Sequence, residues 1–228
     1  MNMRKLLKYG LTGVIVIVSM ISIIMYYRYS LYKKTYSSEY SYEIYIEPDI
    51  PLSDVVLYIP LPFIDTVSPV GDNIVAENLQ TPENLHCNVS TTEYGVMLEI
   101  TADRIDEPST ITVLLPADYS INTRDSLQNE MVLSPKYDLI QVQCDFPYPD
   151  TRETQLACFE YETLIYAEYI HGGALNIVVT LEGRNTWWIL GWSGNSYRDQ
   201  ILARVDGESG WQPVRGKLVQ GEGLYRWI

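Results

Sequence analysis

Residues 155–170, "QLACFEYETLIYAEYI", show the alternation that decides the fold of this chain. Apolar and aromatic side chains recur at every second position, and acidic side chains stand between them. One face carries Phe159, Tyr161, Ile165, Ala167 and Tyr169, and the other carries Glu160, Glu162 and Glu168. A period of two residues is typical of a β-strand with one face in a core and the other in solvent. We therefore expect a long strand of an antiparallel sheet here.

This stretch ends at His171-Gly172-Gly173, and a second alternating stretch, "ALNIVVTLEG", follows at residues 174–183. Glycine tolerates the positive φ values that tight turns require. The two stretches are therefore predicted to pair as a β-hairpin.

Alternation also dominates residues 40–48, 94–101 and 109–116, whereas residues 195–207, "NSYRDQILARVDG", depart from it. In this segment the apolar residues recur at helical spacing, and a serine and an aspartate three residues apart resemble a capping box. Gly207 follows where a helix C-terminus favours glycine. We expect one short helix there, formed by Tyr197, Ile201, Leu202 and Val205 and capped by Ser196 and Asp199.

Together these patterns predict an all-β fold, an antiparallel β-sandwich of immunoglobulin-like or jelly-roll-like type with one short helix near the C-terminus. The sandwich is expected to span residues 41–228. Two sub-modules that meet near residue 150 are an alternative description of the same segment.

Before this domain, residues 11–27, "LTGVIVIVSMISIIMYY", contain no charged side chain. As a helix this segment is about 25 Å long, close to the thickness of the hydrocarbon core of a bilayer. No small-x-small cleavage site follows it, which favours a retained signal anchor over a cleaved signal peptide. The sequence thus predicts a short cytoplasmic tail (1–10), a single transmembrane helix in the lipid bilayer (11–27) and a polar stalk (28–40).

Basic residues flank the apolar segment on both sides, so the positive-inside rule hardly decides its orientation. The short N-terminal tail and the acidic bulk of the chain favour a cytoplasmic N-terminus. We therefore expect a single-pass protein of the cell membrane whose C-terminal domain lies outside the cytoplasm.

The charge of the chain is unevenly distributed. Residues 1–34 hold six of the 16 basic residues and no acidic one, which leaves 10 basic and 29 acidic residues, a net charge of −19, for the rest. Binding to nucleic acid relies on Lys and Arg that neutralise phosphates. A nucleic-acid partner is therefore not expected.

The three cysteines, Cys87, Cys144 and Cys158, suggest one disulfide and one free thiol in an extracytoplasmic domain. Cys144 and Cys158 flank a short loop, but Cys158 shares the strand face of the glutamates. A disulfide between Cys87 and Cys144 is an alternative, because both cysteines are expected on the apolar face of their strand. If the domain is cytoplasmic, we expect three reduced thiols instead. Asn88 begins an Asn-Val-Ser glycosylation sequon and is expected on the solvent face.

Known catalytic patterns are incomplete in this chain. Gly191-Trp192-Ser193-Gly194 resembles a nucleophile elbow, but Asn195 stands where its last glycine belongs. Glu160 and Glu162 would lie roughly 7 Å apart on one strand face, within the range of inverting glycosidases, although such a row is typical of a solvated sheet surface. No Cys or His cluster has the spacing of metal ligands. We expect neither a metal nor a cofactor.

Residues 185–196, "NTWWILGWSGNS", concentrate three tryptophans. In one continuous strand Trp188 and Trp192 share a face and Trp187 takes the other, so both faces are apolar. Such a strand lies in the core or forms a binding surface, and we favour the core. If exposed, Trp188 and Trp192 would stand about 13 Å apart and could stack along an oligosaccharide.

The leading hypothesis is a non-catalytic structural or interaction role at the cell surface, with a protein or glycan partner. It rests on the missing catalytic patterns. A carbohydrate-binding module that uses Trp187, Trp188 and Trp192 is the first alternative, and a glycosidase-type hydrolase is the second.

Overall fold

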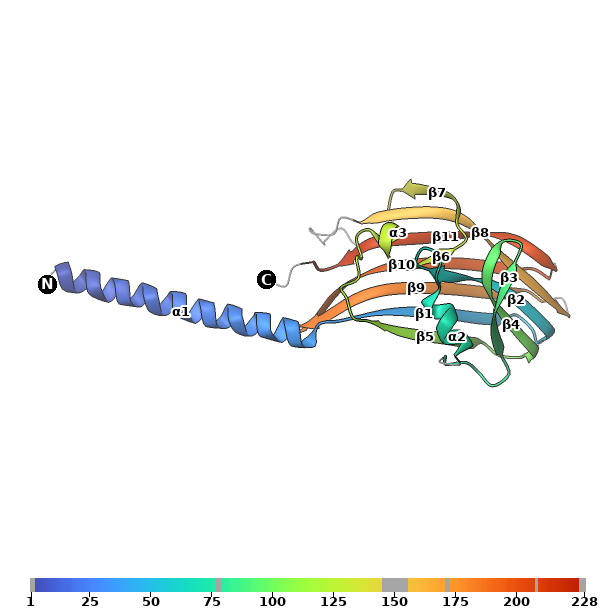
Figure 1. The fold of residues 1–228 in the computed structure, drawn as a ribbon, viewed down its shortest axis with the longest axis horizontal. Coiled ribbons are helices and arrows are strands. Elements are labelled where there is room, and N and C mark those ends of the chain that lie inside the picture. Colours follow the sequence, from blue (N-terminus) through green and yellow to red (C-terminus); the bar gives the residue numbers. More distant parts are fainter. Residues whose placement is uncertain (1–2, 77–78, 145–155, 171–172, 208, 226–228) are drawn as a thin grey trace.

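The computed structural model describes residues 3–76, 79–144, 156–170, 173–207 and 209–225. A long N-terminal helix leads into a curled β-sheet domain (Figure 1). The helices are α1 (Met3–Thr35), α2 (Pro69–Val75) and α3 (Ser126–Asn129). The strands are β1 (Ser37–Pro48), β2 (Leu52–Phe63), β3 (His86–Thr92), β4 (Gly95–Ile105), β5 (Ser109–Ala117), β6 (Val132–Ser134), β7 (Tyr137–Val142), β8 (Ala157–Ile170), β9 (Leu175–Trp188), β10 (Trp192–Val205) and β11 (Gly210–Gly223).

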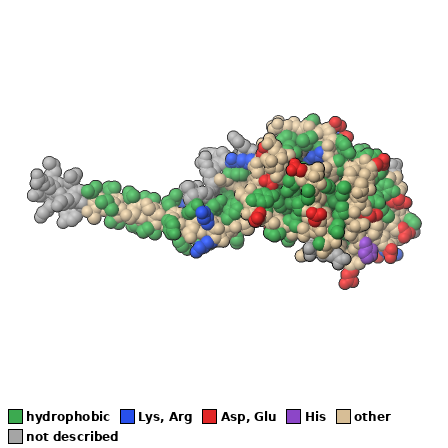
Figure 2. All heavy atoms as spheres, viewed as in Figure 1, with side chains coloured by type: hydrophobic (Ala, Val, Ile, Leu, Met, Phe, Trp, Pro, Cys, Tyr) green, Lys and Arg blue, Asp and Glu red, His purple; other side chains and the backbone are tan. Residues whose placement is uncertain are grey.

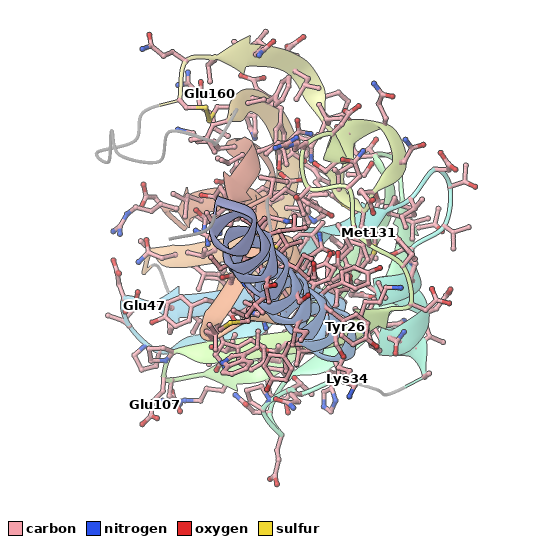
Figure 3. All side chains as sticks on the ribbon, turned by 90° about the vertical axis from the view of Figure 1, so that its left-hand side faces the viewer. Tyr26, Lys34, Glu47, Glu107, Met131 and Glu160 are labelled. Atoms are coloured by element: carbon pink, nitrogen blue, oxygen red, sulfur yellow. A yellow bond between two sulfur atoms is a disulfide. The ribbon has the colours of Figure 1, made fainter. Side chains whose placement is uncertain are left out.

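The strands form one sheet with the order β3-β4-β2-β8-β11-β10-β9-β1-β5, and every pairing in it is antiparallel. Seen from the end where α1 leaves the domain, the sheet curls around its core (Figure 3). The predicted antiparallel β-fold is thus confirmed, whereas an immunoglobulin-like or jelly-roll-like order is not. Strands from before and after residue 150 lie side by side, as β2 with β8 and β1 with β9, so a division into two sub-modules near that residue does not describe the sheet.

The alternation in residues 155–170 is confirmed as β8, because Tyr161, Ile165 and Ala167 are buried in the core. The predicted hairpin of β8 with β9 is wrong. β8 pairs with β11, β2 and β7, and β9 pairs with β10 and β1, so β10 and β11 lie between them. A glycine-rich connection permits a tight turn but does not require one; His171 and Gly172 themselves lie outside the described residues.

The predicted helix near the C-terminus is also wrong, since its residues belong to β10. Buried and less buried side chains alternate along this strand, and the buried ones are Tyr197, Asp199, Ile201, Ala203 and Val205. Asp199 is fully buried among these inward-facing residues. This charged residue interrupts the alternation of apolar and polar residues by which a strand is predicted from the sequence. Leu202, which completed the helical pattern, is 63% exposed.

Two buried tyrosines lie directly opposite glycines on the neighbouring strand. Tyr197 on β10 pairs with Gly183 on β9, and Tyr161 on β8 pairs with Gly216 on β11. A Cβ atom on Gly183 would stand 2.2 Å from the Tyr197 ring, and one on Gly216 would stand 2.1 Å from the Tyr161 ring. The missing side chains therefore make the room that the rings occupy on the inner face of the curled sheet.

Residues 121–136, here called the covering segment, contain α3 and β6 and lie across this inner face. Figure 1 shows α3 and β6 in front of the row of strands from β8 to β5. β6 pairs with the end of β2. The hydroxyl of Tyr197 donates to the Met131 carbonyl, and the Leu133 N–H donates to the Asp199 carboxylate at 2.8 Å. Side chains of the sheet therefore hold this segment in place.

The Asp199 carboxylate also accepts hydrogen bonds from Lys136 Nζ at 2.5 Å and from the Tyr161 hydroxyl at 2.6 Å. Burial lowers the pKa of Lys136, and Asp199 counteracts this effect. Burial and the neighbouring carboxylate raise the pKa of Tyr161, so its hydroxyl stays a donor. The buried acid is thus fully partnered, as a charge at such a position must be.

The segment Leu11–Thr35 of α1 is long and apolar enough to cross a membrane, and an 18-residue stretch within it has a mean hydropathy of 1.8. This agrees with the predicted apolar anchor at residues 11–27. The predicted stalk at residues 28–40 is not a separate unit, because α1 continues to Thr35 and β1 begins at Ser37. Helix and sheet are therefore joined by a single residue, Tyr36.

Filling the space beside a tyrosine ring should weaken the fold. We expect Gly183→Ala to lower the free energy of unfolding by about 1–3 kcal/mol, because the new methyl group overlaps the Tyr197 ring. Chemical denaturation followed by circular dichroism measures this change. Gly191→Ala is the matched control, since no atom lies within 4 Å of a Cβ there. Equal stability of the two variants would contradict the packing described.

Candidate functional site

A cavity of about 390 Å³ lies where α1 joins the sheet. Residues from several separate segments line it, which are Tyr32, Tyr36, Ser120, Ile121, Asn122, Thr123, Arg124, Asn185, Trp187, Asn195 and Tyr225. Its size falls within the range of small-molecule sites in proteins. It combines aromatic rings, amides, hydroxyls and one guanidinium group.

Asn185 on β9 forms the floor of this pocket and is almost completely buried. Its Oδ1 accepts hydrogen bonds from the Ile121 N–H at 3.0 Å and from Ser38 Oγ at 2.7 Å. Its Nδ2 donates to the Ile121 carbonyl at 2.8 Å and to Asn195 Oδ1 at 2.7 Å. The amide thus uses both lone pairs and both protons. It fixes the start of the covering segment as one wall of the pocket.

Thr123, in the same covering segment, ties this wall to β10 and to the residue Tyr225 after β11. Its hydroxyl lies 2.8 Å from Asn195 Oδ1 and 2.7 Å from the hydroxyl of Tyr225. The guanidinium of Arg124 stands over the Tyr225 ring, 3.9 Å from its centroid, in cation–π geometry. Within the described ranges no carboxylate forms a salt bridge with Arg124. Its positive charge is therefore available to a ligand.

Aromatic rings close the side of the pocket that faces α1. Trp187 is 4% exposed, stacks on the Tyr36 ring and meets the Tyr32 ring edge-on. The hydroxyl of Tyr36 lies 2.5 Å from Ser120 Oγ. Thr35 Oγ1 accepts a hydrogen bond from the Trp188 N–H at 2.8 Å, which fastens the end of α1 to β9. The end of the helix is therefore part of the pocket.

The sequence places the three tryptophans in one strand, in the core or at a binding surface, but a turn separates Trp192 from Trp187 and Trp188. β9 ends at Trp188 and β10 begins at Trp192, and the two residues pair directly across the strands. The predicted spacing of about 13 Å along a single strand is therefore wrong. Trp187 lines the pocket, whereas Trp192 is 74% exposed outside it.

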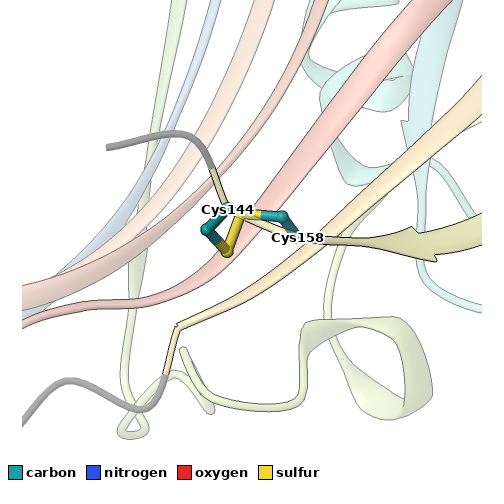
Figure 4. The surroundings of a disulfide bond; sticks show 2 residues. All are labelled: Cys144 and Cys158. Carbon is teal, nitrogen blue, oxygen red and sulfur yellow. A yellow bond between two sulfur atoms is a disulfide. The ribbon is translucent and has the colours of Figure 1, made fainter. Parts of the chain in front are cut away.

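The structure contains a disulfide between Cys144 and Cys158, whose Cα atoms lie 5.3 Å apart (Figure 4). Val142 pairs with Cys158 across β7 and β8, so Cys144, two residues further on, reaches the same face. Cys87 is a half-buried free thiol, and the rival Cys87–Cys144 bridge is not formed. Asn88 is exposed on β3, where a glycan could be attached; its glycosylation stays a prediction.

The carboxylates considered for hydrolysis line a second, smaller hollow of about 260 Å³. Glu160 and Glu162 share it with Asp138 and Arg215, and Glu162 lies directly opposite Arg215 across β8 and β11. Both glutamates therefore extend from the same strand. Glycosidases instead place their two acids on opposite sides of the sugar.

No family model matches the chain, and comparisons with curated proteins and with solved structures give no significant match. The function must therefore be inferred from the residues themselves. Sequence patterns singled out only Trp187 among the residues of the pocket. The others are spread over segments that only the folded sheet brings together.

Removing the Asn185 amide should loosen the pocket wall. We expect Asn185→Ala to lower the free energy of unfolding by about 2 kcal/mol or more, because the N–H and carbonyl of Ile121 lose buried partners. Thermal or chemical denaturation measures the loss. Asn88→Ala, on the surface of β3, is the control and should change stability by less than about 0.5 kcal/mol. A similar small effect at both positions would show that the amide does not hold the covering segment.

Proposed function

We propose that this chain is a single-pass, membrane-anchored, extracytoplasmic domain with a non-catalytic binding role. Its ligand site is the pocket between α1 and the sheet. The observation that carries the proposal is the combination, in one pocket, of tyrosine rings, side-chain amides and a guanidinium without a carboxylate partner among the described residues.

The anchoring part of the proposal is supported by α1, which has the length and the apolar composition of a membrane span. The extracytoplasmic placement is supported by the acidic composition of the domain and by the disulfide, since disulfides persist in oxidising compartments. With this orientation the pocket opens close to the outer surface of the membrane.

The chemistry of the pocket favours a hydroxyl-rich, anionic small molecule, such as an acidic sugar. Aromatic rings pack against the apolar faces of sugar rings, and amides and hydroxyls match sugar hydroxyls. The Asn122 side chain makes no hydrogen bond within the described part of the chain, so it can serve a ligand. Arg124 offers the planar donor pair that binds a carboxylate in a bidentate manner. This proposal keeps a glycan ligand but moves it from the exposed tryptophans to the pocket.

A glycosidase-type hydrolase is less well supported. Glu160 and Glu162 lie outside the pocket, and the Arg215 guanidinium on the facing strand stands beside them. Within the described residues, the pocket itself is lined by no carboxylate. Binding without turnover is therefore the function that the geometry favours.

The proposal predicts saturable binding of glucuronate to the full chain in lipid nanodiscs, with weaker binding of uncharged glucose. Isothermal titration calorimetry measures both affinities. We expect Arg124→Gln to weaken glucuronate binding roughly tenfold or more, because a hydrogen bond to a charged group is lost. Arg104→Gln is the matched control, because Arg104 on β4 forms an exposed salt bridge with Asp106 and lies outside the pocket.

No saturable binding of either sugar would contradict the ligand class. Equal effects of Arg124→Gln and Arg104→Gln would contradict the role given to Arg124. Release of glucose or glucuronate from a glycoside substrate by the wild-type chain would instead support the hydrolase alternative.

A further inference from the structure

The turn between β9 and β10 exposes apolar side chains to an unusual degree. Leu190 at its tip is 75% exposed and Trp192 is 74% exposed. No charged residue lies between Arg184 and Arg198, although charged residues make up 20% of the chain. Leu224, whose N–H donates to the Gly194 carbonyl at 2.8 Å, adds a third apolar side chain that is 46% exposed. Together Leu190, Trp192 and Leu224 are called the apolar tip.

The apolar tip lies at the end of the domain to which α1 is attached. Thr35, the last residue of α1, hydrogen-bonds through its hydroxyl to both the N–H and the carbonyl of Trp188. Trp188 in turn pairs with Trp192. In Figure 1 this hairpin end lies beside the end of α1. The exposed side chains are therefore continuous with the helix that is proposed to cross the membrane.

Turns at the opposite end of the domain have a different composition. Asp49 lies between β1 and β2, Asp106 and Glu107 lie between β4 and β5, and Asp206 follows β10. Acidic side chains gather at this far end (Figure 2). The far end also exposes apolar side chains, Ile50 (48%) and Ile170 (53%), but acidic residues stand near them. Leu190 and Trp192, in the uncharged turn next to α1, are more exposed than either.

We propose that the apolar tip inserts into the interface of the same bilayer that α1 crosses, and so forms a second contact with the membrane. This inference rests on the proposed anchoring of the chain. From Tyr27, the end of the apolar segment, to Thr35 the helix rises about 12 Å. The polar layer on each side of a bilayer is roughly 5–8 Å thick.

On an upright helix the end of α1 therefore stands about 4–7 Å outside this polar layer. A tilted helix brings the tip beside it down to the layer. Tryptophan is enriched within the polar layer, because its ring is apolar and its N–H can still reach water or headgroups. The exposed Lys33 and Lys34 lie in the last turn of α1 and suit lipid phosphates. Docking of the tip fixes the domain upright on its helix, with the pocket next to the headgroups.

The test places an environment-sensitive NBD fluorophore on Leu190→Cys in a Cys87→Ala background, with the full chain reconstituted in phosphatidylcholine–phosphatidylglycerol vesicles. Glu107→Cys, in an exposed turn at the far end, is the matched control. We expect the label at residue 190 to be quenched by brominated lipid and to be several-fold less sensitive to aqueous iodide than the label at residue 107.

A second measurement needs no label: brominated lipid should quench the tryptophan emission of the wild type and of Trp211→Phe, but much less that of Trp192→Phe. Trp211 serves as the control because it packs among Tyr58, Tyr94 and Tyr166. If the chain floats with the vesicles but residues 190 and 107 respond alike, the apolar tip is not in the membrane and this inference is overturned. If the chain does not float with the vesicles at all, the proposed anchoring itself fails.

Discussion

Polar groups on the inner face of the curled sheet must be satisfied without water, and this constraint organises the molecule. The hydroxyls of Tyr40, Tyr42, Tyr161 and Tyr197 and the carboxylate of Asp199 all lie in the core region. A buried polar group without a partner costs more than a hydrogen bond contributes. Tyr197 finds its partner on the covering segment, Tyr40 finds Glu130 there, and Tyr42 reaches the Pro60 carbonyl on β2. The partners therefore specify how the chain crosses the inner face.

The same hydrogen bonds connect the core to the proposed site. Glu130 accepts from the Tyr40 hydroxyl with one oxygen and from the Asn122 N–H, at 2.6 Å, with the other. Asn122 and Arg124 thus stand on a segment that is fixed at Asn185 on one side and at Glu130 on the other. A site built in this way is preorganised, which reduces the entropy that binding costs. The attachment of α1 beside it explains why the proposed ligand and the proposed membrane contact meet at one end of the domain.

The sequence predicts those features that depend on local periodicity. The alternation in residues 155–170 correctly predicts β8, and the uncharged run at residues 11–27 correctly predicts an apolar helix. It fails where a buried polar residue interrupts the pattern, as Asp199 does in β10. It also fails where pairing depends on distant partners, as for β8, whose neighbours are β11 and β2. The pocket could not be predicted, because Asn122, Arg124 and Asn185 belong to segments that meet only in the folded sheet.

The central claim, that side chains of the sheet hold the covering segment in place, is tested most directly by native-state hydrogen exchange. The N–H groups of Ile121 and Leu133 donate to the sheet side chains Asn185 and Asp199. The Asn122 N–H donates to Glu130 of the same segment, which the Tyr40 hydroxyl of β1 holds in turn. If the claim holds, these amides exchange as slowly as those in the middle of β9 and β10, because only global unfolding exposes them. Fast exchange of the three amides while β9 and β10 stay protected would contradict it, since the covering segment would then open independently of the sheet.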